Sequence, residues 1–150
     1  LAEGMLERKK KREGFNFYHY TIDLTGGPCI YKRVAGCGVG TEYQAVTPTG
    51  DLYPCHQFVG NDEMLMGNVY EGVTHPEIVE MFLKGNNVYT RDKCRDCFAK
   101  RYCAGGCSAN NYHSNGDIDK VYELGCELHR KRIECAIMLK VAEQELGLEE

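Results

Sequence analysis

The sequence predicts an α+β fold: a small, loop-rich domain with a β-hairpin and a long C-terminal helix. Residues 42–58 place two alternating segments on either side of a Pro-Thr-Gly-Asp turn at positions 48–51, a pattern typical of a β-hairpin. From about Asp119 onward, apolar side chains recur at steps of three, four and seven residues, which predicts one long helix with an apolar face. The members of this face are Leu124, Leu128, Cys135, Met138 and Ala142.

Shorter elements are predicted upstream of this helix. Residues 1–14 are densely charged, and we expect them to be the end of a helix that belongs to a longer protein. Residues 15–24 are rich in aromatic and β-branched side chains and favour a strand, although no nearby segment offers it a partner. Residues 75–84 predict a short amphipathic helix, with Pro76 near its start and Gly85 just past its end.

The composition excludes several classes of function. The net charge is −4, from 18 Lys and Arg against 22 Asp and Glu, and the basic residues gather mainly in the first dozen positions. This argues against a nucleic-acid partner. No apolar run is long enough to cross a bilayer and no secretory h-region is present, so we expect no membrane partner and a cytoplasmic location. In a reducing compartment, nine cysteines favour metal binding over disulfides.

Seven of the nine cysteines form one ordered pattern. It reads Cys37, twelve residues, Gly50, four residues, Cys55, then Cys94-x2-Cys97-x5-Cys103-x3-Cys107, then eighteen residues and Cys126. Two thiolates three residues apart can bind one metal centre while the intervening backbone N–H groups point at sulfur. The segment from Arg91 to Asn111 is too rich in cysteine and glycine for a core element, so we expect its order to come from what it binds.

Two kinds of metal site compete for these thiols. A structural zinc site takes four tetrahedral ligands, commonly from two separated CxxC pairs. Here only one CxxC pair exists, and the surplus of thiols over one tetrahedral site is left unexplained. Thiolate-only sites suit both metals, and the residues favour iron–sulfur over zinc.

The cysteine order resembles the SPASM domain, the seven-cysteine C-terminal extension of many radical SAM enzymes that modify peptides and proteins. The stretches GDLYPC at 50–55 and CAGGC at 103–107 are also similar to that family. Closer similarity, in YHYTIDLTGGPC, CGVGTEYQAVTPTGDLYPCHQFVG and MGNVYEG, links the chain to the maturases that install thioether cross-links in cysteine-rich SCIFF precursor peptides. The resemblance implies three segments: the C-terminal end of a radical SAM partial (β/α) barrel at 1–28, the auxiliary-cluster domain at 29–130, and a C-terminal helix at 131–150.

The resemblance also implies two auxiliary [4Fe–4S] clusters with interleaved ligands. The first would take Cys37, Cys55 and Cys107, with Cys29 as fourth ligand. The second would take Cys94, Cys97, Cys103 and Cys126. In a competing arrangement Cys29 lies away from the first cluster, which leaves one iron open to a thiolate of the precursor peptide. A cysteine-rich precursor peptide and a reducing electron donor are the implied partners.

The chain contains no CxxxCxxC triplet, the motif that binds the catalytic cluster of radical SAM enzymes. The resemblance therefore assigns that third [4Fe–4S] cluster and S-adenosylmethionine to another part of a longer enzyme. Two alternatives remain: another SPASM-type peptide- or protein-modifying enzyme, and a non-enzymatic zinc-binding interaction module.

Individual residues near the pattern have competing interpretations. His56 follows a predicted ligand, where the related sulfatase-maturating enzymes have an acidic base. This departure puts formylglycine formation in doubt. His56 is a candidate catalytic residue that takes a proton or bonds a cluster sulfur, or it is only a hairpin residue. A further set of basic side chains either offsets the charge of the second cluster or is merely solvated. This set is Lys93, Arg95, Lys100 and Arg101.

Overall fold

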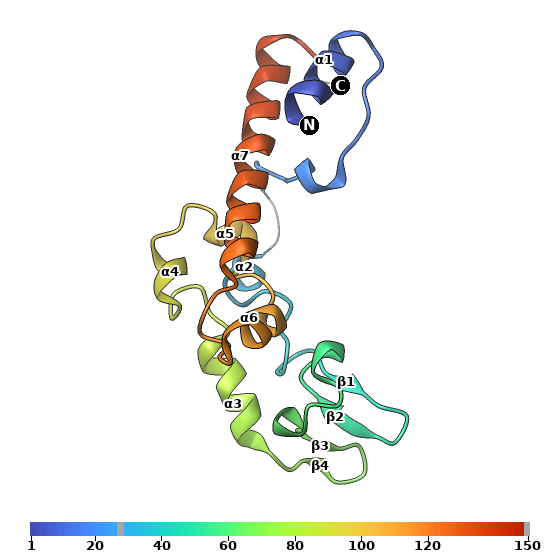
Figure 1. The fold of residues 1–150 in the computed structure, drawn as a ribbon, viewed down its shortest axis with the longest axis vertical. Coiled ribbons are helices and arrows are strands. Elements are labelled where there is room, and N and C mark those ends of the chain that lie inside the picture. Colours follow the sequence, from blue (N-terminus) through green and yellow to red (C-terminus); the bar gives the residue numbers. More distant parts are fainter. Residues whose placement is uncertain (27–28, 149–150) are drawn as a thin grey trace. The chain divides into compact units, whose positions relative to one another are not determined.

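The computed structural model describes residues 1–26 and 29–148, and the chain divides into two units. Unit 1 comprises Leu1–Gly27 with Glu127–Glu150, and unit 2 comprises Pro28–Cys126. The content is mixed helix and antiparallel sheet, which confirms the α+β class (Figure 1). Among the described residues, no helix is both long and apolar enough to cross a membrane.

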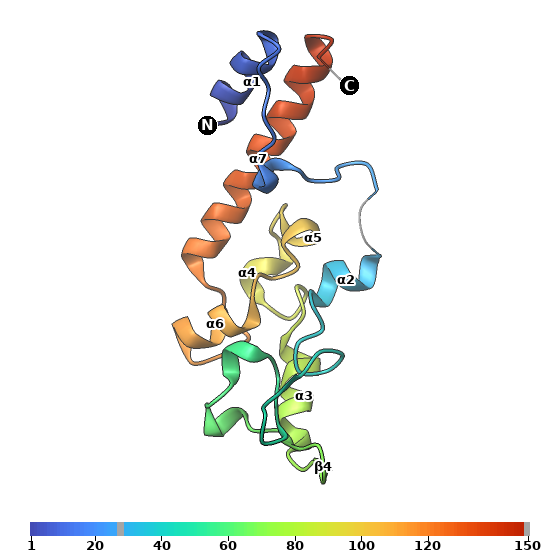
Figure 2. The same ribbon diagram turned by 90° about the vertical axis from the view of Figure 1, so that its right-hand side faces the viewer.

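Unit 1 consists of α1 (Ala2–Lys10), a short 3-10 turn and most of α7 (Glu123–Glu145). Figures 1 and 2 both show α1 alongside the C-terminal part of α7. An ion pair of 3.1 Å between Lys9 Nζ and Glu143 Oε1 joins the two helices. Arg132 of α7 donates to the backbone oxygen of His19 and holds the connecting segment against the same helix.

The strand predicted at 15–24 is wrong. Its centre is the 3-10 turn Tyr18–Tyr20, in which the Tyr20 N–H donates to the Phe17 oxygen at 2.8 Å. Aromatic side chains make this segment resemble a strand, but a strand needs a neighbour to pair its backbone groups. The described elements of unit 1 are all helices, so this segment has no strand to pair with. Its backbone groups form hydrogen bonds within the 3-10 turn instead.

The long C-terminal helix is confirmed, but its predicted apolar face is wrong. The buried side chains of α7 are Ile133, Ala136 and Leu139. Leu124 and Leu128 of the predicted face are 51% and 62% exposed. At 100° per residue the buried arc lies about a third of a turn from the predicted one. Periodicity identifies an apolar stripe, whereas the neighbouring segment decides which stripe is covered.

Unit 2 carries a four-stranded antiparallel sheet of order β1-β2-β3-β4. The predicted hairpin is confirmed as β1 (Ala45–Val46) and β2 (Asp51–Tyr53), with Val46 opposite Leu52. Two further strands, β3 (Gly67–Asn68) and β4 (Gly72–Val73), extend it and were not predicted. Two-residue strands carry too little alternation to be recognised in a sequence.

The helices of unit 2 are short. The predicted helix at 75–84 is confirmed as α3 (Pro76–Gly85), which buries Ile78 and Phe82. Phe82 meets Phe58 edge-on at 5.7 Å in a core that includes Met64 and Met66. The remaining helices are α2 (Ile30–Ala35), α4 (Asp92–Arg95), α5 (Lys100–Cys103) and α6 (Ser108–Asn115).

Candidate functional site

Three predicted ligands from separate stretches of unit 2 approach one another. Cys55 lies buried just after β2, whereas Cys37 and Cys107 are exposed. Burial raises the pKa of the Cys55 thiol, and the neighbouring Cys107 and Cys37 raise it further. Hydrogen bonding from the backbone N–H groups of Gln57 and Phe58 lowers this pKa, and the Phe58 N–H donates to the Cys55 backbone oxygen at 3.0 Å. The Gln57 side-chain amide also reaches Cys107 Sγ, at 3.5 Å.

Close packing of a glycine loop brings Cys37 to this place. The Gly40 N–H donates to the oxygen of Pro54 at 3.2 Å, so the loop that follows Cys37 lies beside the residue that precedes Cys55. Gly40 has φ of 74°, and a Cβ there would lie 2.7 Å from the Phe82 ring. Only glycine satisfies both the backbone conformation and the ring contact.

The other four predicted ligands form a second set. Burial raises the pKa of Cys103 to about 11, with Cys126 and Cys94 adding to the rise. Burial also raises the pKa of Cys94. The neighbouring Cys126 and Cys97 raise this pKa further, whereas Arg91 lowers it. Cys94 and Cys126 therefore both influence Cys103, and Cys97 influences Cys94. Cys94 and Cys126 also pack with Val88, Val121 and Val34 in a small apolar cluster.

A left-handed turn connects the two thiol sets. Ala104, Gly105 and Gly106 have φ of 53°, 83° and 76°, and they separate Cys103 of the second set from Cys107 of the first. The Gly106 N–H donates to the Cys103 backbone oxygen at 3.2 Å, and hydrogen bonding from the backbone N–H groups of both glycines opposes the rise of the Cys103 pKa. Donors of this kind stabilise a thiolate that binds an iron–sulfur cluster.

A buried arginine, which sequence reasoning missed, lies beside the second set. Arg91 is 1% exposed. Its guanidinium donates to Gly105 O and Ile118 O, both at 3.0 Å, and to Asn86 Oδ1 and Ser108 Oγ at 3.3 and 3.4 Å. Burial lowers the Arg91 pKa, and nearby acidic groups oppose this shift, namely Cys94, Asp119, Cys103 and Cys126.

The four basic residues selected from the sequence are placed differently from Arg91. Lys93 and Arg95 are exposed and pair with Glu123 and Asp92. Lys100 and Arg101 lie over the ring of Tyr89 at 5.6 and 5.5 Å. No pattern in one sequence separates the buried arginine from its exposed neighbours.

Three cysteine and histidine positions stand apart from these sets. Cys29 is exposed at the N-terminal end of α2, and the described residues include no interaction between it and the first set. His56 is exposed at the start of the 3-10 turn that follows Cys55. Cys135 belongs to unit 1, where its side chain hydrogen-bonds Tyr20. His113 is linked to the first set through Gln57. Its Nε2 lies 3.1 Å from the Gln57 backbone oxygen, and the Gln57 side-chain amide reaches Cys107 Sγ.

The described residues contain no preformed site for a single metal ion. Across residues 1–26 and 29–148, which include all nine cysteines, no three His, Cys, Asp or Glu side chains lie close enough to hold a single ion. The donor set, which is made of thiols alone, suits both zinc and an iron–sulfur cluster.

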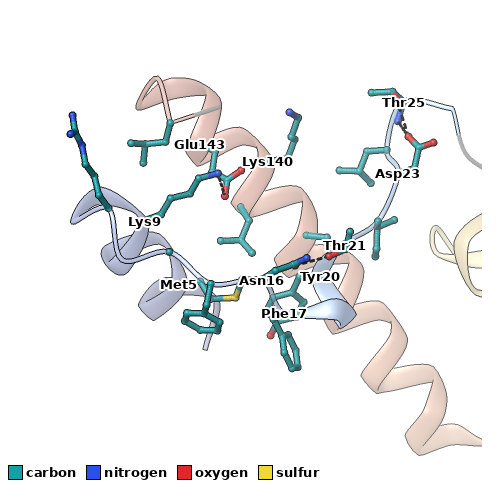
Figure 3. A pocket seen from close by; sticks show the side chains of 18 residues that line it. Met5, Lys9, Asn16, Phe17, Tyr20, Thr21, Asp23, Thr25, Lys140 and Glu143 are labelled. Atoms are coloured by element: carbon teal, nitrogen blue, oxygen red, sulfur yellow. Dashed lines mark hydrogen bonds and ion pairs between the residues drawn. The ribbon is translucent and has the colours of Figure 1, made fainter. Parts of the chain in front are cut away.

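Unit 1 contains a cavity of about 850 Å³ between α1, the following segment and α7 (Figure 3). Phe17 and Tyr20 contribute aromatic walls, and the Lys9–Glu143 ion pair spans one side. None of the predicted ligand cysteines lines it.

Comparison with known proteins shows a similarity to an archaeal protein. No protein-family model matches the chain. A stretch of 100 residues, 65% of the chain, is 27% identical to an uncharacterized protein of Archaeoglobus fulgidus. The match covers 24% of that protein, so the chain spans about a quarter of the length of this relative.

Proposed function

We propose that this chain is the auxiliary-cluster region of a radical SAM peptide maturase and binds two [4Fe–4S] clusters. One observation supports the proposal: thiols from distant stretches of the chain influence one another's pKa in two sets, and hydrogen bonding from backbone N–H groups lowers the pKa of one buried thiol in each set, Cys55 and Cys103. Hydrogen bonds of this kind favour the thiolate and tune the potential of a bound cluster. Such clusters supply electron transfer or a binding position for a substrate sulfur.

Backbone N–H groups and burial act on the thiols of both sets before any metal binds. Gln57 and Phe58 direct N–H groups at Cys55, and the glycine turn does the same at Cys103. Burial keeps the metal-free thiols Cys55, Cys94 and Cys103 protonated, so binding of the metal must release their protons.

The first set supplies three thiols, and the second supplies four. A fourth position on the first cluster would belong to Cys29 or to a thiolate of the precursor peptide. The second option suits an enzyme that attaches a cysteine sulfur to carbon. In the proposed reaction of the whole maturase, a deoxyadenosyl radical removes a substrate hydrogen, and the resulting carbon radical bonds to the sulfur of a substrate cysteine. That cysteine would lose its thiol proton, and an auxiliary cluster would accept the one electron that is released. Radical formation belongs to another part of the enzyme, because this chain lacks CxxxCxxC.

Anaerobic reconstitution of the intact protein tests the proposal. Two [4Fe–4S] clusters account for roughly eight irons beyond those of the radical SAM cluster. The Cys94→Ala variant should lose about four of these, with a matching loss of sulfide and visible absorption. Cys135→Ala is the matched control, because Cys135 belongs to neither set, and it should keep all of them. Stoichiometric zinc without visible absorption would instead establish the non-enzymatic zinc module.

Substitution of Cys29 separates the two models of the first cluster. If Cys29 is a ligand, Cys29→Ala should change the spectrum of the first cluster in the absence of peptide. If the spectrum is unchanged, and adding the precursor peptide shifts it as in the unsubstituted enzyme, the peptide thiolate occupies the open position.

A further inference from the structure

Arg91 is the largest fully buried side chain among those the structure describes. A buried cation is costly unless it is hydrogen-bonded and faces an opposite charge. Its four hydrogen-bond partners are neutral: two backbone oxygens, an amide oxygen and a hydroxyl. The acidic groups that face it are Asp119 and three thiols of the second set, which become negative when they bind a metal.

The contacts of Arg91 reach most of the segments that carry the thiols. Its bond to Gly105 holds the turn between Cys103 and Cys107, and its bond to Ile118 holds the segment that leads to Cys126.

The partners of Arg91 extend this network. Asn86 Oδ1 also accepts from Ser108 Oγ at 2.8 Å, at the start of α6 beside Cys107. The Nδ2 of Asn86 donates to Ala35 O at 2.7 Å, two residues before Cys37. Asn111 Nδ2 supports the same Gly105 oxygen at 3.2 Å. The three polar residues of this network are all buried, namely Asn86, Ser108 and Asn111. One internal hydrogen-bond network therefore connects the segments that carry the thiols.

We propose that Arg91 is the positioning residue of the two thiol sets and the fixed positive charge of the second one. The inference rests on the proposed iron–sulfur function for its second part only. The hydrogen bonds preset the thiol-bearing turn before a metal binds, and the charge stabilises the reduced, more negative state of the second cluster. The two roles separate chemically, because Lys retains the charge without the planar fork of donors and Gln retains amide donors without the charge.

The test uses Arg91→Lys and Arg91→Gln in the intact protein, with Arg95→Gln as the matched control on an exposed arginine. In the metal-free, reduced protein, amide hydrogen exchange over residues 104–122 should rise about tenfold or more in both Arg91 variants, as expected for loss of a charged hydrogen bond. It should stay unchanged in the control. Unchanged exchange in Arg91→Lys would overturn the positioning role, and this variant decides that role alone if Arg91→Gln does not fold.

A redox titration of the reconstituted protein, followed by EPR, tests the charge role. Arg91→Gln should lower the reduction potential of the second cluster, while Arg91→Lys and Arg95→Gln leave it near that of the unsubstituted protein. Equal potentials in all four proteins would overturn this role. If Arg91→Gln does not fold, Arg91→Lys decides the charge role. This variant keeps the positive charge, so a clear fall in the reduction potential of its second cluster would overturn that role. A protein that binds no iron would refute the proposed function, yet hydrogen exchange would still decide whether Arg91 positions the turn.

Discussion

Substitution of Gly105 by alanine should destabilise unit 2 far more than the same change at the next residue. Gly105 has φ of 83°, and an added Cβ would lie 2.2 Å from Arg91 Nη1. The left-handed backbone costs about 1–2 kcal/mol for alanine. Displacing Arg91 from its bond to the Gly105 oxygen adds about 1.5–3 kcal/mol, because the donor is charged and buried. The expected total is about 3–5 kcal/mol.

Gly106→Ala is the matched control for this substitution. Gly106 has φ of 76°, but the nearest atom to its added Cβ is Asn111 Oδ1 at 3.9 Å, so only the backbone cost of about 1–2 kcal/mol remains. Amide hydrogen exchange over α6 in the metal-free protein measures the difference. Gly105→Ala should exchange at least about tenfold faster than Gly106→Ala, since about 1.4 kcal/mol corresponds to a factor of ten. Equal exchange in the two variants would refute the proposed contact between Gly105 and the guanidinium.

Four further predictions concern the core, the thiols and unit 1. Phe82→Ala should cost about 3–5 kcal/mol in the free energy of unfolding, whereas Leu83→Ala, at a side chain that is 62% exposed, should cost under about 0.5 kcal/mol, as measured by urea unfolding. At pH 8 the metal-free Cys103 should react with iodoacetamide about a hundredfold more slowly than an ordinary thiol, because its pKa is raised from 9.0 to about 11 and only the thiolate reacts. Since the unfolded thiol loses its proton near pH 9 while the folded one keeps it to about pH 11, the stability of the metal-free protein should fall across that interval. A double-mutant cycle on Lys9 and Glu143, read by urea unfolding, should give a coupling under about 1 kcal/mol, because both side chains are partly exposed.

Each of these predictions has a result that would contradict it. Equal costs for the two substitutions in α3 would mean that the aromatic core is not packed as described. If Cys103 is alkylated as fast as the exposed Cys29, its thiol is not buried in the metal-free protein. A coupling of several kcal/mol between Lys9 and Glu143 would mean that this pair is far more shielded from water than its surface position implies.

The sequence predicted those elements whose signals are local. The hairpin follows from a turn of proline, glycine and aspartate, and α3 begins at Pro76 and ends at Gly85. The strand predicted at 15–24 failed because aromatic composition favours a strand only where a partner is present. The apolar face of α7 failed for a similar reason, since residues from the other end of the chain decide which side chains are buried.

For the candidate site, too, one part could be predicted from the sequence and another part could not. The sequence showed one ordered pattern of seven cysteines, and the resemblance that this pattern carries implied which thiols belong to which set. Only the tertiary structure showed that Arg91 is buried while Arg95, four residues later, is exposed. Both are arginines in the same cysteine-rich segment. The difference arises from Gly105, Ile118, Asn86 and Ser108, whose polar groups converge on one guanidinium only after distant segments have folded together.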